Sequence, residues 1–448
     1  MLLGRNQAEE LLKRALRFSE ADETQVLVGA HESYLTRFAN NMIHQNVAEA
    51  NVSLTIRAVV EKRSGTATTN RTNDEALAQA AERAVSHARR QPEDPDFPGL
   101  PDPQPIEPAP SFDEEVASLT PEARARSVGV LCDLAAEHKF IASGAFRTSA
   151  GELAIANSHG IMAYHAGTSA DLQVVVTGED GTGQAHLSSW KMSDIDAEAI
   201  GREAVGKAVR AQHPRANQLG EYTVVLDPYA TEDLVAMLNA TGMGAQAVQE
   251  GRSWMNDRIG QPIMSPLVSI WDDGHDLEGS PLPFDFEGVP RQRVPIVDRG
   301  VVRGPVYDRY TAKKEGREST GHATPPTMRF VSGPLAMNLF IGAGDSTVDE
   351  MIRSTARGLY ITRFWYTRPV HPRDCIVTGM TRDGLFMIED GELAHAVKNL
   401  RFTQSYVKAM GGVQAASRER RTLITEFGGA QRVPALKIEA FNFTGSTV

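Results

Sequence analysis

Cysteine is scarce in this chain, whose 448 residues include only Cys132 and Cys375. A secreted protein of this size usually carries more cysteines, so two distant thiols predict a reduced, cytoplasmic protein. The N-terminal residues lack a charged segment followed by an apolar run, which argues against a signal peptide. Apolar stretches long enough to cross a membrane are absent from the sequence as well, so we expect no membrane partner.

Positively charged residues are also fewer than negatively charged ones, with 46 lysines and arginines against 57 aspartates and glutamates. The formal net charge is -11, whereas proteins that bind nucleic acids usually present a basic face. We therefore expect no nucleic-acid partner. The remaining composition, 41% hydrophobic and 23% charged, is typical of a globular protein, and the length fits two or three domains.

Several common active-site motifs are missing. The sequence has no Gly-x-x-x-x-Gly-Lys-Ser/Thr phosphate loop and no Gly-x-Ser-x-Gly nucleophile elbow. The glycine turn at 342–345 is too short for a dinucleotide fingerprint, and it ends in an aspartate that would repel phosphate. The chain therefore carries no signature of a nucleotide site or a serine hydrolase.

Metal ligands are present but scattered, including twelve histidines. His31 and Glu32 are not followed by a second histidine one helical turn later, and their segment favours a strand. The densest acidic group offers oxygen ligands for hard cations, but we interpret it as a polar turn between strands. This group comprises Asp272, Asp273, Asp276, Asp285 and Glu287. We predict no metal site in this chain.

Two further segments are candidates for chemistry. Cys375 lies close to His371 in the sequence, but nothing supplies an oxyanion hole, so a structural cysteine is preferred to a nucleophile. The run from Arg363 to Arg368 mixes cations with aromatic side chains. Such a run either grips an extended ligand or packs its aromatics inward as a strand, and both interpretations stay open.

The first half of the chain repeats one order of predicted elements. Each part has a helix, several strands, a glycine turn, a strand and a second helix, so we predict a duplicated α/β unit across residues 1–215. The first part has a helix at 6–18, strands at 25–30, 33–38 and 50–58, a turn at 61–65 and a helix at 74–90 with a capping box from Thr72 to Glu75. The second part has a helix capped by Thr120, strands near 140–147, 152–157, 161–165 and 170–177, a turn at 178–183 and a helix at 196–211.

A proline-rich connector at 92–112 separates the two parts, and eight prolines fall between residues 92 and 110. Proline lacks an amide donor and has a fixed φ, so we expect an extended, polyproline-like segment on the surface. From residue 221 the pattern changes to short apolar runs split by glycine, after a strand at 222–226 and a helix at 231–248. The expected fold class is α+β, with the duplicated domain at 1–215 followed by a mostly antiparallel, barrel-like domain at 221–448.

Six segments occur in order along nearly the whole chain: 36–46, 156–160, 272–274, 283–290, 319–322 and 378–393. Together they resemble the TldD/PmbA family. The turn Ser319-Thr320-Gly321-His322 is similar to the family's Thr-Gly-Asn turn, with histidine in place of asparagine. The resemblance implies a two-subunit peptidase, in which a TldD-like subunit holds zinc with a His-Glu-x-x-x-His helix and a C-terminal cysteine.

The second, TldE/PmbA-like subunit of such a peptidase lacks these ligands, and this chain is similar to it. The helix after the strand at 222–226 continues through Leu234-Val235-Ala236-Met237-Leu238-Asn239-Ala240-Thr241-Gly242, without histidine or glutamate. The segment 411–429 has no cysteine. Because alanine and methionine cannot hold zinc as histidine does, the resemblance implies no catalytic residue and no cofactor here, with zinc in the partner.

The resemblance further implies that the chain completes a closed cleft with a TldD-like protease subunit, into which unfolded or short peptides enter as extended strands. Candidate substrate-binding residues are Arg37, Asn40, Asn41, Arg363 and Tyr366. For the first three, strand-edge and turn chemistry is an equally good interpretation. Two other functions stay open: a regulatory interaction protein, and an independent enzyme that uses Cys375, His371 or His322. Whether the free chain forms a homodimer is open as well.

Overall fold

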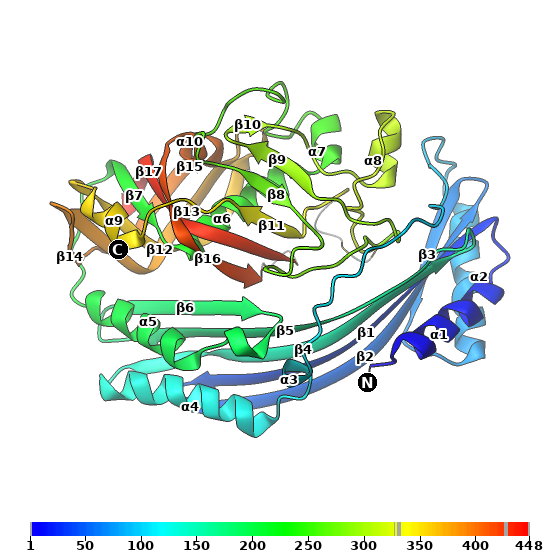
Figure 1. Cartoon of the computed structure of the whole chain (residues 1–448), viewed down its shortest axis with the longest axis horizontal. Coiled ribbons are helices and arrows are strands. Elements are labelled where there is room, and N and C mark those ends of the chain that lie inside the picture. Colours follow the sequence, from blue (N-terminus) through cyan, green and yellow to red (C-terminus); the bar gives the residue numbers. More distant parts are fainter. Residues whose placement is uncertain (1, 327, 329–332, 425–428, 447–448) are drawn as a thin grey trace.

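The computed structural model describes residues 2–326, 328, 333–424 and 429–446. It confirms the α+β class: two sheets lie face to face, and the helices of the first half cover the outer side of the first sheet (Figure 1). The first sheet uses residues 23–189 and the second uses residues 220–446. The division of the chain into domains at 215–221 stays a prediction. Within the described residues, no helix is both long and apolar enough to span a membrane.

The first sheet has six antiparallel strands in the order β3-β2-β1-β4-β5-β6. One order of elements, helix–three strands–helix, occurs twice, so the two halves of the sheet are built on the same plan. The first set is α1 (Arg5–Arg17), β1 (Glu23–Ala39), β2 (Met42–Val60), β3 (Arg63–Thr69) and α2 (Asp74–Arg90). The second set is α4 (Pro121–Glu137), β4 (Ile141–Asn157), β5 (Met162–Thr177), β6 (Thr182–Ser189) and α5 (Ala197–Arg210).

Gly65 on β3 and Gly183 on β6 occupy corresponding places in the two halves. A Cβ atom at Gly65 would lie 2.1 Å from the backbone nitrogen of Ala88 on α2. A Cβ atom at Gly183 would lie 2.3 Å from the backbone nitrogen of Ala208 on α5. Since real Cβ atoms do not approach so closely, each glycine allows its helix to pack directly on its strand. The turn predicted at 61–65 is shorter, with positive φ at Glu61 and Lys62, and Gly65 lies inside the strand.

The strand breaks predicted in the first half are wrong. The segments 25–30 and 33–38 form the single strand β1, and the four segments between 140 and 177 form only β4 and β5. The polar middle of β4 is paired with β1 on one side and with β5 on the other, as at Glu152, which faces both Ala30 and Ala166. Pairing on both sides satisfies the backbone there, so the strands continue without an apolar pattern.

The helices α2 and α4 begin at polar caps. Thr120 caps α4 as predicted, since its hydroxyl accepts a hydrogen bond from the amide of Ala123 at 3.2 Å. The cap of α2 is Asn73, one residue after the predicted Thr72, because the Asn73 side chain accepts from the amide of Ala76 at 3.2 Å.

The proline-rich connector is not confined to the surface, in contrast to the expectation. Phe97, Leu100 and Ala109 are buried. The Pro101 carbonyl accepts a hydrogen bond from Asn157 at 2.7 Å, and the Gly99 carbonyl accepts one from Arg309 at 3.0 Å. The connector therefore contacts both the first sheet and the helix α8 (Arg309–Lys314), before the short helix α3 (Glu114–Ala117).

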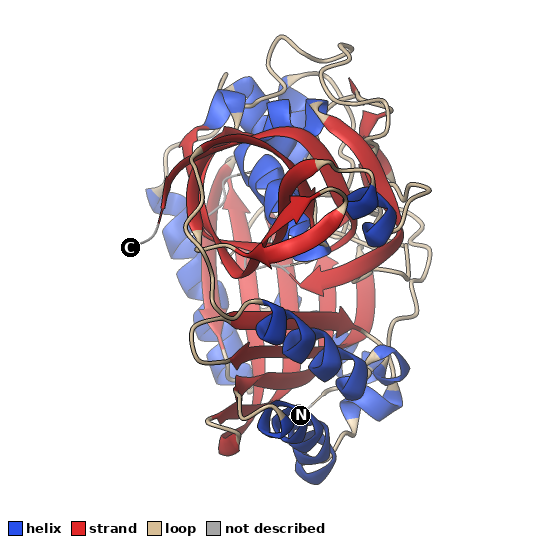
Figure 2. Ribbon diagram, turned by 90° about the vertical axis from the view of Figure 1, so that its left-hand side faces the viewer, coloured by secondary structure: helices blue, strands red, loops and turns tan. Residues whose placement is uncertain are grey.

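The second sheet has eleven strands and curls into a ring (Figure 2). The ring closes because β17 pairs with both β15 and β7, while β13 and β12 complete the circuit. Most pairs are antiparallel, but β12–β7 and β11–β17 are parallel. The strands are β7 (Gly220–Leu226), β8 (Ile270–Asp272), β9 (Val294–Asp298), β10 (Val301–Val302), β11 (Asn338–Ile341), β12 (Arg357–His371), β13 (Ile376–Glu389), β14 (Glu392–Ala396), β15 (Leu400–Ser405), β16 (Val413–Ile424) and β17 (Ala430–Ser446).

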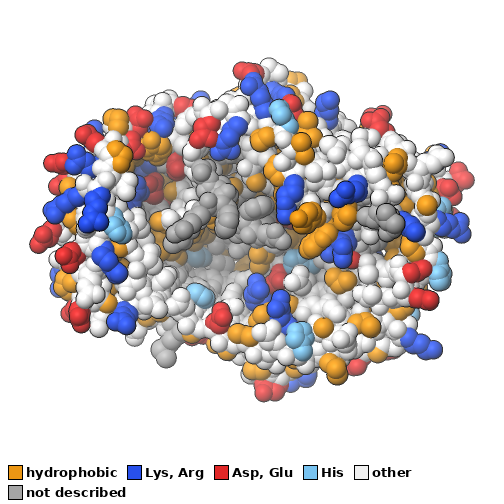
Figure 3. All heavy atoms as spheres, turned by 180° about the vertical axis from the view of Figure 1, so that it is seen from behind, with side chains coloured by type: hydrophobic (Ala, Val, Ile, Leu, Met, Phe, Trp, Pro, Cys, Tyr) orange, Lys and Arg blue, Asp and Glu red, His pale blue; other side chains and the backbone are white. Residues whose placement is uncertain are grey.

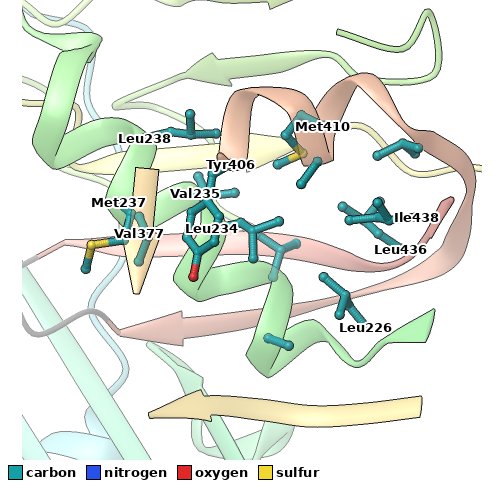
Figure 4. Packing of buried hydrophobic residues seen from close by; sticks show 14 of the residues in the cluster. Leu226, Leu234, Val235, Met237, Leu238, Val377, Tyr406, Met410, Leu436 and Ile438 are labelled. Carbon is teal, nitrogen blue, oxygen red and sulfur yellow. The ribbon is translucent and has the colours of Figure 1, made fainter. Parts of the chain in front are cut away.

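The helix α6 (Pro228–Leu238) follows β7 directly and is buried against this ring. Its side chains Leu234, Val235 and Leu238 are fully buried and pack among residues of β7, β17 and α10 (Tyr406–Gly411) (Figure 4). After Leu238 the chain makes a π-helical turn (Asn239–Met243) and then α7 (Ala245–Gln249), where the sequence predicts one continuous helix. The remaining helices are α8 (Arg309–Lys314) and α9 (Val348–Arg353).

Candidate functional site

A cleft of about 940 Å³ lies between the two sheets, and one face of the molecule is hollowed there (Figure 3). Its first wall comes from β5 and β6, which contribute Gln173, Gln184 and His186. The facing wall comes from α6, the π-helical turn, α7 and the stretch 363–369 of β12. We call this space the cleft.

The cleft is lined from α6 and the π-helical turn by Glu232, Asp233, Ala236, Met237, Asn239, Ala240 and Thr241. The carboxylates of Glu232 and Asp233 are the only ionisable groups in this set, and without a histidine or cysteine beside them they do not make a zinc site. The hydroxyl of Thr241 is already used, since it donates to the carbonyl of Met237 at 2.6 Å. Across the described parts of the chain, no group of three or more histidine, cysteine and acidic side chains is arranged to hold a metal ion. That this chain works without zinc stays a prediction.

Asp233, one turn earlier on α6, lines the cleft but serves the fold. It accepts a hydrogen bond from the hydroxyl of Thr367 at 2.6 Å and another from the hydroxyl of Tyr406 at 2.7 Å. Burial raises the pKa of Tyr406 well above its ordinary value, and the charge of Asp233 raises it further. Asp233 therefore fixes α6 to β12 and α10.

Both interpretations of the run 363–368 that the sequence left open apply, each to different residues of the run. Phe364 is buried, whereas Trp365 and Tyr366 are 42% and 67% exposed. The pairing of β12 with β13 shifts register between Trp365 and Arg368, and Tyr366 has a left-handed φ of 55° in this bulge. One aromatic thus packs inward while two extend from the strand at the cleft.

Arg363 and Tyr366, the two candidates on β12, both line the cleft. The Nε atom of Arg363 donates to Asp383 at 2.6 Å, and its guanidinium lies 4.8 Å from the ring centre of Trp365. The guanidinium of Arg368 lies 4.4 Å from the ring centre of Tyr366. These cation–π contacts hold the exposed aromatic rings beside positive charge.

Arg37, Asn40 and Asn41 do not belong to the described lining of the cleft. Asn40 and Asn41 form the turn between β1 and β2, with φ values of 53° and 57°. Asn41 also links this turn to β4, because its side chain donates to the carbonyl of Phe140 at 2.9 Å and accepts from the amide of Ala142 at 2.6 Å. Arg37 is exposed on β1. The structure favours turn chemistry for both asparagines.

His186 faces the cleft from β6, and no sequence pattern marks it as a site residue. Its Nε2 atom lies 2.6 Å from a carboxylate oxygen of Asp171 on β5, and the hydroxyl of Ser188 donates to the same oxygen at 2.6 Å. Burial raises the pKa of Asp171, but the hydrogen bonds from His186 and Ser188 outweigh it, so the pKa lies below its ordinary value. Only the register of β5 with β6 brings these three residues together.

A second unpredicted group connects the two sheets through Tyr229, which lines the cleft. The hydroxyl of Tyr229 accepts from the amide of His186 at 2.9 Å and from Arg421 on β16. Glu203 on α5 accepts from Arg421 at 2.8 Å and from Lys207 at 2.8 Å. Burial raises the pKa of Glu203, but the charges of Lys207 and Arg421 lower it below its ordinary value. This network holds the two walls of the cleft together.

Cys375 has the surroundings of a structural thiol. It is fully buried, and its Sγ atom lies 3.3 Å from the hydroxyl oxygen of Thr241. Burial raises the pKa of this thiol to about 12, so the reactive thiolate is not available at neutral pH. His371, its proposed base, is half exposed, and its Nδ1 atom lies 3.3 Å from Asp374.

His322 and the acidic group also serve the fold. The Nε2 atom of the fully buried His322 lies 2.9 Å from Asp272. Asp285 accepts hydrogen bonds from three backbone amides, those of Glu287, Val289 and Ala323. Burial and the charge of Glu287 raise the pKa of Asp285 to about 7. These bonds agree with the interpretation of this acidic group as a polar turn.

Sequence profiles of one family match most of the chain. The profile of the PmbA/TldA metallopeptidase C-terminal domain matches residues 219–445. The profiles of domain 1 and of the central domain of the same family match residues 25–88 and 101–212.

Curated relatives agree with this assignment. The metalloprotease PmbA of Escherichia coli O157:H7 is 23% identical over 86% of this chain and 85% of its own length. A metalloprotease of Methanothermobacter thermautotrophicus is 28% identical over 53% of this chain, and the match spans 52% of that protein. The TldD homologue of Haemophilus influenzae is 27% identical over 48% of this chain and 45% of its own length. The chain thus spans about half the length of several relatives that it matches.

Solved structures show the same fold. TldE from Thermococcus kodakarensis superposes with a TM-score of 0.88 at 22% identity, over 98% of this chain and 99% of that one. A Thermotoga maritima protein described as a modulator of DNA gyrase gives a TM-score of 0.88 at 19% identity, over 97% of this chain and 100% of that one. With the family profiles covering both sheets, the chain belongs to the TldD/PmbA family of metalloprotease-like proteins.

Proposed function

We propose that this chain is the metal-free, non-catalytic subunit of a TldD/TldE-type heteromeric metalloprotease. The observation that supports the proposal is the cleft surface of α6 and the π-helical turn, where Ala236, Met237 and Ala240 occupy the segment in which the family resemblance implies metal ligands. Alanine and methionine side chains can neither polarise a peptide carbonyl nor activate a water molecule. Bond cleavage therefore belongs to a TldD-like partner that supplies the zinc.

The cleft of this subunit binds part of the peptide substrate. Tyr366 and Trp365 offer exposed rings for stacking, and Arg363 places positive charge beside them. His186 and Gln173 on the opposite wall provide polar atoms. A site of stacked rings and a few polar groups tolerates many peptide sequences, which suits unfolded or short peptides.

The first experiment compares the purified chain with the chain mixed with a TldD-type protein from the same organism. We expect no stoichiometric zinc by elemental analysis and no cleavage of a fluorescent peptide library by the chain alone, and cleavage by the mixture. Cleavage by the lone chain after treatment with a chelator would contradict the proposal.

A second experiment tests the cleft within the mixture. Tyr366→Ala is expected to raise KM for peptide cleavage about tenfold, because it removes one stacking surface worth roughly 1–2 kcal/mol. The matched control is Tyr310→Ala, because Tyr310 lies outside the described lining of the cleft. Its ring also has a cation beside it, since the Nζ atom of Lys314 lies 4.3 Å from the ring centre. Equal effects of the two variants would argue against a peptide site on β12.

A further inference from the structure

A second cavity of about 840 Å³ lies where α5, α9 and β14 meet, at one end of the molecule (Figure 1). We call this cavity the groove. None of the described residues that line the groove also lines the cleft. Its volume falls within the range of roughly 300–1,000 Å³ that is usual for pockets that bind small ligands. The groove is therefore a separate space with room for a small ligand.

The floor of the groove is apolar. Ile352 on α9, Tyr360 on β12 and Phe386 on β13 are buried, and the ring centres of Tyr360 and Phe386 lie 6.0 Å apart. Leu393 on β14 extends this surface and is partly exposed. On the wall formed by α5, Gly206 has no side chain, and a Cβ atom there would meet nothing within 4 Å. The groove thus combines apolar surface with open space for an aliphatic or aromatic group.

The more buried polar groups of the groove already have partners. The hydroxyl of Tyr360 donates to Asp227 at 2.5 Å. Lys207 donates to Asp227 at 2.9 Å and to Glu203 at 2.8 Å. Glu203 also accepts a hydrogen bond from Arg421 at 2.8 Å. These groups hold the fold together, so the recognition of a ligand depends on the charged side chains at the rim of the groove.

Four exposed charged side chains at the rim lack such partners. They are Arg210 at the end of α5, Asp349 and Arg353 on α9, and Glu392 at the start of β14. Among the residues that the structure describes, none of the four takes part in an ion pair or a side-chain hydrogen bond. Asp349 and Arg353 lie one helical turn apart, and yet no ion pair joins them. The rim therefore offers two cations and two carboxylates to a ligand.

We propose that the groove binds a short peptide with free termini and apolar side chains, with a dipeptide as the smallest form. The carboxylate of the peptide pairs with Arg210 and Arg353, and its ammonium group pairs with Asp349 and Glu392. The apolar side chains cover the floor of the groove. Two extended residues span at most about 7 Å, and residues four apart on a helix, such as Asp349 and Arg353, are separated by about 6 Å along its axis. The charges on α9 alone are thus spaced for the two ends of a dipeptide.

Charge complementarity favours this ligand over a fatty acid or another anionic amphiphile. A lone carboxylate could pair with the two arginines, but it would lie beside Asp349 and Glu392, which would repel it. A peptide with free termini provides a counter-charge for both signs. Such peptides are also products of proteolysis, so the groove suits the proposed function, although binding to the chain alone does not depend on that function.

Isothermal titration calorimetry of the purified chain with the dipeptide Leu-Leu tests the charges. We expect one equivalent to bind, and the dissociation constant to rise at least about tenfold when Arg210→Met is combined with Arg353→Met. The matched control is Arg90→Met, because Arg90 is the exposed last residue of α2, the helix that corresponds to α5. N-acetyl-Leu-Leu-amide carries neither charge and should also bind at least about tenfold more weakly. Equal affinity for the capped and the free dipeptide would overturn the proposal.

A steric block tests the location of the ligand without changing any charge. Gly206→Trp places a ring in the groove and should abolish the binding of Leu-Leu, whereas Gly129→Trp on α4, with equally open space around the new Cβ, should not. Tyr366→Ala tests the cleft as the competing site. Loss of binding in Tyr366→Ala but not in Gly206→Trp, or no binding to the wild-type chain, would overturn the proposal and leave the role of the cleft untouched.

Discussion

The guanidinium of Arg421 on β16 lies 2.8 Å from the carboxylate of Glu203 on α5, and this contact ties the second sheet to the first. Both side chains are about three-quarters covered, with 28% and 25% exposure. Arg421 also donates a hydrogen bond to the hydroxyl of Tyr229. The same hydroxyl accepts a hydrogen bond from the backbone amide of His186 on β6. The geometry of the cleft therefore depends on one charged contact outside it.

Replacement of Arg421 by methionine is expected to lower the free energy of unfolding by about 2 kcal/mol, because Glu203 and Tyr229 lose a charged donor in a largely covered site. Urea denaturation followed by circular dichroism measures the change. The matched control is Arg202→Met on α5, whose pair with Glu198 is 66% and 60% exposed and should contribute less than about 0.5 kcal/mol.

Asp171 should make a contribution to the free energy of unfolding that depends on pH. Its folded pKa lies below the ordinary value of 3.8, so the ionised form is favoured in the folded state. The contribution is fully present above pH ~4 and is lost as the pH falls through the folded pKa. Asp171→Asn should therefore destabilise the chain more at pH 7 than at pH 3, in urea titrations at both values. Asp102→Asn, at a side chain 88% exposed, is the surface control and should change the free energy of unfolding little at pH 7.

The close contact at Gly65 predicts opposite signs for two glycine-to-alanine substitutions. Gly65→Ala should destabilise the chain by about 2 kcal/mol or more, since its Cβ would meet the backbone of α2. Gly129→Ala, inside α4 with open space around the new Cβ, should stabilise it by roughly 0.5–1 kcal/mol. Thermal unfolding of both variants measures the difference, and a neutral Gly65→Ala would contradict the packing described for β3.

The thiols should be unreactive in the folded chain. Burial raises the pKa of Cys375 to about 12 and also raises that of Cys132. An Ellman titration is expected to find no fast-reacting thiol between pH 7 and 9, and two thiols in guanidinium chloride. Fast reaction of one thiol in the folded chain, lost in Cys375→Ser, would revive the nucleophile interpretation.

Local patterns predicted the class of fold and the repeated order of elements, because helix caps and apolar periodicity act over a few residues. Thr120 was predicted as a cap and is one. The strand breaks were wrong because the polar middles of β1 and β4 are paired on both sides, which no local pattern reveals. The register of the strands could not be predicted from local patterns either. The approach of Asp171 to His186 depends on that register, so it could not be predicted.

The candidate site was predicted in part. Arg363 and Tyr366 were found from an unusual run of cations and aromatics, and both line the cleft. Arg37, Asn40 and Asn41 came from a segment of the family resemblance, and the structure places the two asparagines in a tight turn instead. The Tyr229 network had no signal in the sequence, because Glu203, Tyr229 and Arg421 are brought together only by the packing of α5 on the second sheet.

The closure of the ring has a consequence for biosynthesis. Leu226 of β7 pairs in register with Leu436 of β17, so the first strand of the second sheet obtains this neighbour only after the ribosome has passed Leu436. The first sheet needs no residue beyond Ser189 for its strands and can form while the ribosome is still working. Contacts of such long sequence separation form slowly. We therefore expect β7 and α6 to wait in the nascent chain for β17, and the cleft to form after the first sheet.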